Sequence, residues 1–188
     1  MTNVIASVFV SLDGVMEAPG PAHGVDFAGW TMPYGSPDLY KITGEELFGA
    51  KALLLGRVTY EGFAAAWPGR TDEAGFADRM NSMPKYVVTS STAKLEWTNS
   101  HRVDTDLKTS IAKLEREADG DLLVAGSARL VQGLLAADLL DELKLMIYPV
   151  VIGRGQRLLD GVSAKLSLVE SRGLGDVIYA RYRRTTSK

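Results

Sequence analysis

Short apolar runs recur along the chain and end at glycine or polar residues, which is typical of buried strands. Val4–Val10, Ala52–Leu55 and Leu122–Ala125 show little polar alternation, as expected for strands covered on both faces. Lys85–Thr89 is a further predicted strand, and Asp141–Ile152 is a long one. These runs predict the core of a sheet.

Segments with helical spacing lie between the predicted strands. Leu107, Ile111 and Leu114 form one apolar stripe, and a second recurs after Ser127. The other predicted elements are helices at Ile42–Ala50, from Gly56 to before Pro68 and at Asp72–Met83, short extended pieces at Leu95–Trp97 and His101–Val103, and an antiparallel pair of Leu166–Val169 with Val177–Tyr182. The pattern predicts an α/β chain that closes in a hairpin.

Two of the buried strands end in glycine and lead directly into a helix. Gly126 and Ser127 follow one strand, and Ser127 is expected to cap the next helix by accepting a backbone N–H. Gly56 ends another strand in the same way. A helix start leaves unpaired N–H groups and the positive end of the helix dipole, which together attract phosphate. One such turn alone is more often an ordinary connection, but two in one chain favour phosphate binding.

Side chains near these turns add groups that can bind phosphate or sugar. Arg57 can meet a phosphate with paired N–H bonds, and Thr59 adds a hydroxyl. The alternative for Arg57 is a surface ion pair with Glu61, one helical turn on. After the predicted strand at 85–89, hydroxyls that could contact a sugar or phosphate, or simply reflect loop composition, belong to Ser90, Ser91 and Thr92.

An acidic residue and a long aromatic loop follow the first strand. Asp13 lies just beyond the carboxyl end, where open α/β sheets place ligands, although an Asp–Gly turn accounts for it equally well. Residues from Glu17 to about Asp38 form a loop long enough to act as a lid. Its aromatic residues, Trp30 among them, could cover a flat heterocycle, anchor the loop or form a subunit interface. Asp13 and Trp30 are therefore candidate substrate-binding residues.

Composition limits the possible functions. The 188 residues suit one domain over residues 1–188, and the absence of cysteine excludes thiol chemistry. His23 and His101 have no neighbouring ligand in the sequence, so no metal site is expected. The 21 Lys and Arg residues nearly balance 23 Asp and Glu residues, which argues against nucleic-acid binding. No apolar run approaches bilayer length, so we expect a soluble cytoplasmic protein without membrane contact.

Two motifs that suggest a binding site are not expected to form one. Gly153–Arg154–Gly155 begins like a dinucleotide-binding fingerprint, but the third glycine is missing and a hairpin follows instead of a parallel crossover. The basic residues near the C-terminus are expected to form a solvated strand edge and tail; they are Arg181, Arg183, Arg184 and Lys188.

The order and spacing of five motifs resemble the dihydrofolate reductase-like superfamily, closest to the group with the reductase domain of the riboflavin-biosynthesis deaminase/reductase. The motifs are Ser11–Gly14 (SLDG), Leu54–Glu61 (LLGRVTYE), Lys85–Ser90 (KYVVTS), Val124–Ser127 (VAGS), and Asp141–Leu143 with Pro149–Gly153. They span nearly the whole chain. The resemblance implies a three-layer α/β/α fold with a mixed, mainly parallel sheet and a C-terminal antiparallel hairpin.

The resemblance also implies NADPH as the cofactor. In the family, positions matching Gly56, Arg57 and Thr59 meet the phosphates of the cofactor. Positions matching Gly126 and Ser127 lie under the pyrophosphate. Positions matching Thr89, Ser90 and Ser91 lie beside the adenosine ribose and its 2′-phosphate.

The chain also departs from the family pattern. It has Ala125–Gly126–Ser127 where many members have consecutive glycines, so close approach of the backbone to pyrophosphate is less assured. The helical carboxylate that dihydrofolate reductases use for the pterin has no clear counterpart, and the length leaves no room for a deaminase domain. Dihydrofolate itself is therefore not the expected substrate.

Three function hypotheses follow. The first is an NADPH-dependent reductase that transfers a hydride to a C=N or C=O carbon of a small heterocyclic substrate, pterin- or pyrimidine-like. Asp13 then orients the substrate or relays the proton, and the loop around Trp30 closes over it. The second is a non-catalytic nucleotide-binding or regulatory module, and the third is a self-associating structural protein. A homodimer is expected and is compatible with all three.

Overall fold

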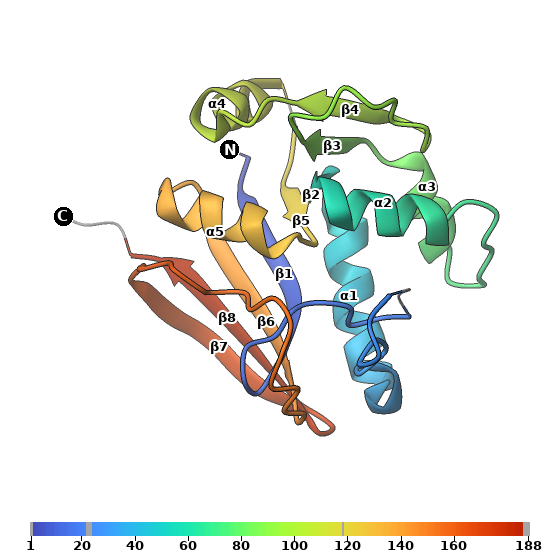
Figure 1. Ribbon diagram of the computed structural model, residues 1–188, viewed down its shortest axis with the longest axis vertical. Helices are drawn as coiled ribbons and strands as arrows, with labels where there is room; N and C mark the ends of the chain where they lie inside the picture. The colour runs from blue at the N-terminus through green and yellow to red at the C-terminus, as the bar shows by residue number, and fades with distance from the viewer. Residues whose placement is uncertain (1, 22–23, 118, 186–188) are drawn as a thin grey trace.

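An eight-stranded sheet forms the centre of the computed structural model, which describes residues 2–21, 24–117 and 119–185 (Figure 1). The strand order is β4-β3-β2-β5-β1-β6-β8-β7, and neighbours are parallel except for the β6–β8 and β8–β7 pairs. The strands are β1 (Val4–Ser11), β2 (Ala52–Gly56), β3 (Lys85–Val88), β4 (Ser100–Val103), β5 (Leu122–Val124), β6 (Glu142–Tyr148), β7 (Leu166–Leu174) and β8 (Val177–Arg184). The mixed, mainly parallel sheet with a closing hairpin is confirmed.

Helices cover both faces of this sheet. They are α1 (Pro37–Gly49), α2 (Arg57–Ala66), α3 (Phe76–Ser82), α4 (Leu107–Glu117) and α5 (Ala128–Ala136), with a short 3-10 turn η1 (Met32–Tyr34). Buried side chains of α4 and α5 share one core cluster with alternate residues of β1, whereas α1, α2 and α3 pack on the other face. Every residue of β2 and β5 is buried, as their unbroken apolar runs predict.

Two helices begin at places that the apolar pattern did not indicate. α1 begins at Pro37, five residues before the expected Ile42, because the Ser36 hydroxyl accepts a hydrogen bond from the Leu39 N–H at 3.2 Å and proline suits the first helical position. The Glu17–Asp38 loop is therefore shorter than expected at its far end.

The start predicted for α3 at Asp72 is wrong. The Asp72 carboxylate lies outside the helix and accepts hydrogen bonds from the N–H groups of Phe76 and Ala77, at 2.9 and 2.6 Å. It therefore acts as an acceptor for the exposed N–H groups of the first turn. These bonds also lower the pKa of Asp72 from its ordinary value.

The predicted cap by Ser127 is also wrong. Ser127 occupies the N-cap position of α5, but its hydroxyl makes no capping hydrogen bond, and its carbonyl accepts from the Val131 N–H at 3.1 Å. The Ser127 hydroxyl is directed at Gly56 of the neighbouring strand instead. Contact between the two turns therefore takes the place of a side-chain cap.

Two strand predictions need correction. β6 ends at Tyr148, not at Ile152, because Pro149 lacks an N–H and the Val150 N–H donates back to the Tyr148 carbonyl at 2.8 Å. Leu95–Trp97 is not a strand; the Trp97 N–H donates to the Tyr60 hydroxyl at 3.0 Å. The short piece at His101–Val103 does form a strand, as part of β4.

The C-terminal hairpin is longer than expected, and its basic residues do not lie on the edge. β7 is the edge strand, while Arg181 and Arg183 lie on β8 inside the sheet. The expected edge position is therefore wrong for these residues, although the Arg183 side chain is 60% exposed and pairs with Glu142 at 2.8 Å. Lys188 lies outside the described residues. Within the described ranges, no helix is long and apolar enough to cross a bilayer.

Candidate functional site

Four neighbouring parallel strands end together at one end of the sheet. β3, β2, β5 and β1 follow one another in space, so the residues after their carboxyl ends are neighbours. Thr89 follows β3, Gly56 ends β2, Gly126 follows β5 and Asp13 follows β1. The sheet thus gathers the residues chosen from sequence at the place where open α/β sheets bind ligands.

The two glycine turns are in direct contact. The Gly56 N–H donates to the Gly126 carbonyl at 3.0 Å, and a Cβ on Gly56 would lie 2.2 Å from the Ser127 hydroxyl oxygen. Only glycine at position 56 allows this approach. The starts of α2 and α5 therefore lie side by side, with their first N–H groups near one another.

Gly126 is covered by two side chains. It has a φ of +133°, which favours glycine, and an added Cβ would meet Thr59 Oγ1 at 2.8 Å and Met16 Cε at 2.9 Å. Thr59 was expected near a phosphate. It lies in the first turn of α2, after Gly56, and its side chain also contacts Gly126. Met16 was not singled out in the sequence, because an isolated methionine after a strand carries no pattern.

Arg57 lies on the first turn of α2, with half of its side chain exposed. Its guanidinium donates to Glu61 at 2.8 Å, which is the ion pair considered as the alternative in the sequence. Such exposed pairs contribute only about 0.2–1 kcal/mol, so the guanidinium can exchange Glu61 for a stronger anion. Arg57 is thus placed at the two turns and is free to change partners.

The hydroxyls after β3 make local hydrogen bonds. Thr89 is buried, and its hydroxyl accepts from the Ser91 N–H at 3.0 Å, while the Ser91 hydroxyl accepts from the Ala93 N–H at 3.2 Å. Ser90 is exposed beside them. These residues follow the strand next to β2, and a role at a ribose or 2′-phosphate stays a prediction.

Asp13 is held by a set of hydrogen bonds. Its carboxylate accepts from the Ser11 hydroxyl at 2.7 Å and from the N–H groups of Ile152 and Gly153 at 3.1 and 2.7 Å. The Ser11 bond is the largest contribution, and together these bonds lower the pKa of Asp13 to about 2. Asp13 is therefore ionised at neutral pH and is already engaged as an acceptor.

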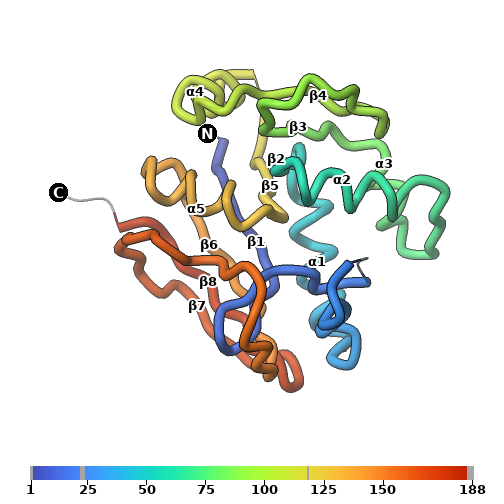
Figure 2. Tube along the Cα trace, viewed as in Figure 1, coloured from blue at the N-terminus to red at the C-terminus, as the bar shows by residue number. Residues whose placement is uncertain are grey.

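The same residue belongs to a clasp between two distant segments, residues 12–17 and 150–158, which Figure 2 shows as neighbouring blue and orange tubes. Arg157 Nε donates to the Asp13 carbonyl at 3.0 Å, and the Leu158 N–H donates to the Gly14 carbonyl at 2.9 Å. Gln132 of α5 donates to the carbonyls of Arg157 and Leu158, each at 3.1 Å. The clasp fixes the segment that carries Met16 to α5, the helix that follows Ser127. Nothing in the sequence indicated this pairing, because the two segments lie about 140 residues apart.

Trp30 anchors the long loop. Its indole is 8% exposed, donates to the Glu17 carbonyl at 2.8 Å and packs edge-on against Tyr148 with ring centroids 5.4 Å apart. These contacts match the anchoring alternative from the sequence. Contact between Trp30 and a substrate stays a prediction.

The described residues include no group of three His, Asp or Glu side chains that could hold a metal ion. His101 contacts Asn99 at 3.0 Å, and His23 lies outside the described residues. The groups that the two turns present are backbone N–H groups, hydroxyls and the guanidinium of Arg57.

Comparisons with known proteins extend this picture. A crystal structure described as a putative riboflavin biosynthesis protein from Shewanella sp. PV-4 matches 98% of this chain and 99% of its own, with a TM-score of 0.76 and 21% identity. Dihydrofolate reductase from Enterococcus faecalis, solved with NADP(H), matches 97% of this chain and 96% of its own, with a TM-score of 0.65 and 18% identity. These structures confirm the fold.

Sequence comparisons identify the family to which these structures point. An uncharacterised Bacillus subtilis protein, YyaP, is 24% identical over 168 residues, which cover 88% of this chain and 84% of YyaP. The RibD C-terminal domain matches residues 2–180 of this chain. The resemblance inferred from the five motifs is thereby confirmed, and the chain belongs to the RibD C-terminal domain family.

Proposed function

We propose that this protein is an NADPH-dependent reductase that transfers a hydride to a C=N or C=O carbon of a small pyrimidine- or pterin-like heterocycle. The observation that carries the proposal is the contact between the Gly56 and Gly126 turns, which places two helix starts beside one another. The N–H groups and the positive dipole end of a helix start attract phosphate, and two adjacent helix starts offer such a site to each phosphate of a pyrophosphate. Family and fold are those of reductases, and they supply the substrate class.

The residues present fit an anionic dinucleotide. Glycine at position 56 and the φ of +133° at Gly126 leave the backbone of both turns without Cβ atoms. Arg57 supplies the charge, Thr59 and Ser127 supply hydroxyls, and Thr89, Ser90 and Ser91 follow the next strand for the adenosine end. When bound, the cofactor supplies the hydride, while these residues position its phosphates.

Asp13 has a positioning role in this proposal. Its low pKa and its three donors mean that it does not deliver a proton at neutral pH. It holds residues 152 and 153 against the end of β1. The proton that completes the reduction would then come from solvent.

The decisive experiment compares NADPH binding by the wild-type protein and Arg57→Ala. A charge-assisted contact with phosphate contributes about 1.5–3 kcal/mol, so Arg57→Ala should weaken NADPH binding by about ten- to a hundredfold. Isothermal titration calorimetry measures the affinity. The matched control is Arg116→Ala, an exposed arginine on α4, which should leave affinity unchanged. Equal affinity in wild type and Arg57→Ala would remove Arg57 from the site.

One observation favours a second function, a nucleotide-binding module without turnover. Asp13 is the candidate proton relay predicted from the sequence, but its hydrogen bonds keep it ionised. The residues predicted from the sequence therefore supply no proton donor, which favours a protein that binds the nucleotide without turning it over. Oxidation of NADPH against a panel of pterins, pyrimidines and quinones separates the two functions. Tight NADPH binding with no oxidation above background would favour the module, and oxidation with any heterocycle would favour the reductase.

A further inference from the structure

A cavity of about 340 Å³ lies at the opposite end of the sheet from the two glycine turns. It is lined by Ile5, near the start of β1, and by Leu122 and Leu123 in β5, whereas Gly56 and Gly126 lie at carboxyl ends. The second half of α1 forms one wall, and β6, β8 and β7 form the other. Its volume falls within the range of small-molecule sites, about 300–1,000 Å³. The cavity is thus separate from the proposed cofactor site.

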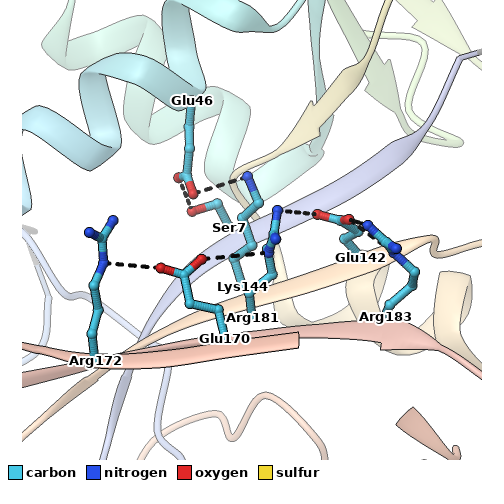
Figure 3. Close-up of polar contacts among 8 residues, drawn as sticks. All are labelled: Ser7, Glu46, Glu142, Lys144, Glu170, Arg172, Arg181 and Arg183. Atoms are coloured by element: carbon cyan, nitrogen blue, oxygen red, sulfur yellow. Dashed lines mark hydrogen bonds and ion pairs between the residues drawn. The ribbon is translucent and has the colours of Figure 1, made fainter. Parts of the chain in front are cut away.

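The α1 wall supplies carboxylates. The Glu46 side chain is only 8% exposed; one oxygen accepts from the Ser7 hydroxyl at 2.5 Å, and the other lies 3.3 Å from Lys144 Nζ (Figure 3). That second oxygen receives no hydrogen bond from any residue that the structure describes. Buried carboxylate oxygens normally accept one, so Glu46 keeps an acceptor available. Glu45 adds an exposed carboxylate on the same wall.

The sheet wall supplies two cations and one carboxylate, that of Glu170, and Asp121 adds another carboxylate just before β5. Lys144 has the Glu46 ion pair but no hydrogen bond within the described ranges, and its side chain is 14% exposed. Arg172 contacts Glu170 only through Nε, at 3.3 Å, and Figure 3 shows its two terminal nitrogens pointing away from that carboxylate. Both cations therefore retain N–H donors at the cavity.

Apolar and phenolic surface completes the lining. Ile5, Ile42 and Leu123 line the cavity, and Tyr179 lies below Arg172 with 5.6 Å between the guanidinium carbon and the ring centroid. Burial raises the pKa of Tyr179 to about 12, and Glu46 and Glu170 add to the rise. The phenol therefore stays protonated and can donate a hydrogen bond.

We propose that this cavity binds a small zwitterion with an apolar body, of the chemical class of free amino acids. Lys144 and Arg172 hold its carboxylate, and Glu45 and Glu46 hold its ammonium. Lys144 and Arg172 already pair with Glu46 and Glu170, at 3.3 Å each, but both retain further donors. A simple anion would face the lining carboxylates and a simple cation would face the two basic side chains, whereas a zwitterion offers each a group of opposite charge.

The test uses L-phenylalanine and two probes of the same shape that each lack one charge. 3-Phenylpropionate lacks the ammonium, and 2-phenylethylamine lacks the carboxylate. Calorimetric titration of the full chain at low salt should give a dissociation constant below about 1 mM for L-phenylalanine. Each single-charge probe should bind about tenfold more weakly or worse, because it loses one charge-assisted contact.

Two variants assign the contacts. Arg172→Gln should weaken L-phenylalanine binding by about tenfold or more and leave 2-phenylethylamine binding unchanged. Glu46→Gln should weaken 2-phenylethylamine binding and leave 3-phenylpropionate binding unchanged. Because Arg172 is half exposed, Arg172→Gln keeps the test valid even if Glu46→Gln fails to fold. Arg116→Gln is the matched control on a remote helix.

The outcomes separate this site from the reductase proposal. L-phenylalanine binding that persists under saturating NADPH and falls in Arg172→Gln supports a second site, whatever the result with Arg57→Ala. Equal affinity for all three probes, no binding at about 10 mM, or unchanged affinity in Arg172→Gln would overturn it. Competition between NADPH and L-phenylalanine would overturn it as well, because the ligand would then occupy the cofactor site.

Discussion

Gly56 is the residue on which the contact between the two turns depends. An alanine Cβ there would lie 2.2 Å from the Ser127 hydroxyl oxygen and 3.1 Å from the Ser127 backbone nitrogen, so Gly56→Ala must separate the turns. Overpacking of this kind costs about 1–3 kcal/mol. We expect Gly56→Ala to lower the free energy of unfolding by that amount in urea denaturation, and to weaken NADPH binding.

Two further variants test the cause. Removing the opposing side chain in Gly56→Ala/Ser127→Gly should recover part of the lost stability. Gly62→Ala on the same helix has open space around its Cβ and should stabilise the protein by up to about 1 kcal/mol. Full stability in Gly56→Ala would show that the turns can move apart without cost.

Lys85 is a fully buried ammonium with no carboxylate partner among the residues that the structure describes. Its Nζ donates to the carbonyls of Asn81 and Thr98 at 2.6 and 3.0 Å and lies 4.3 Å from the Trp97 ring centroid. Burial lowers the pKa of Lys85 from 10.5 to about 8. Between these two values the unfolded chain binds more protons than the folded one, so stability should rise with pH across that window.

The corresponding measurement is a pH series of urea denaturation for wild type and Lys85→Met. From about pH 8 to 10.5, the free energy of unfolding of the wild type should increase relative to that of Lys85→Met by about 1–3 kcal/mol. Parallel curves for the two proteins would mean that Lys85 titrates normally.

Individual site residues were predictable to unequal degrees. Gly56, Arg57 and Gly126 stand in local patterns, strand then glycine then helix, and the structure places them together. The residues that contact them could not be predicted, namely Met16 at Gly126 and Ser127 at Gly56. These contacts depend on which strands are neighbours, and no short stretch of sequence specifies that order.

The clasp between residues 12–17 and 150–158 joins the end of β1 to the segment that follows β6. Asp13 is central to it, and its depressed pKa makes the clasp pH-dependent. A carboxylate with a lowered folded pKa stabilises the protein above its unfolded pKa of about 4, and this contribution disappears as pH falls to about 2.

We therefore expect Asp13→Asn to lower stability near neutral pH and to show a shrinking difference from wild type between pH 4 and pH 2. Urea denaturation across that range measures both effects. Asp160→Asn, an exposed aspartate beyond the clasp, serves as the control and should match wild type throughout. A deficit in Asp13→Asn that stays constant down to the lowest pH would contradict this account.

Element types were predictable, and element ends were less so. Period and composition identify strands and helices because both depend on burial within a few residues. The ends of α1, α3 and β6 depend on single polar or proline residues, namely Ser36, Asp72 and Pro149, whose effect outweighs the apolar pattern.

Trp30 couples the long loop to the body of the molecule. Its indole packs on Tyr148 of β6, and its N–H reaches the start of the loop at Glu17. Trp30→Ala should lower the free energy of unfolding by about 3–5 kcal/mol, as expected for a buried large aromatic residue. Thermal and urea unfolding measure this loss. Trp30→Phe keeps most of the packing and should lose much less, whereas an equal loss in both variants would assign the effect to the N–H bond.

The architecture as a whole was accessible because five spaced motifs identified the superfamily, whose mixed, mainly parallel sheet and C-terminal hairpin the structure confirms. Neither the clasp nor the cavity behind α1 could be derived in that way. Both arise from side chains on elements far apart in the sequence, such as Glu46 with Lys144 and Asp13 with residues 152 and 153.

The position of β1 in the middle of the sheet also affects how the protein is made. β1 is made before the other strands of this sheet, and it pairs with β5 and β6, whose residues emerge more than a hundred positions later. Until then its backbone N–H and C=O groups have no permanent partners, and late, distant pairing of this kind slows folding. A nascent chain halted before residue 142 should therefore remain sensitive to protease, and resistance should appear only after β6 has been synthesised.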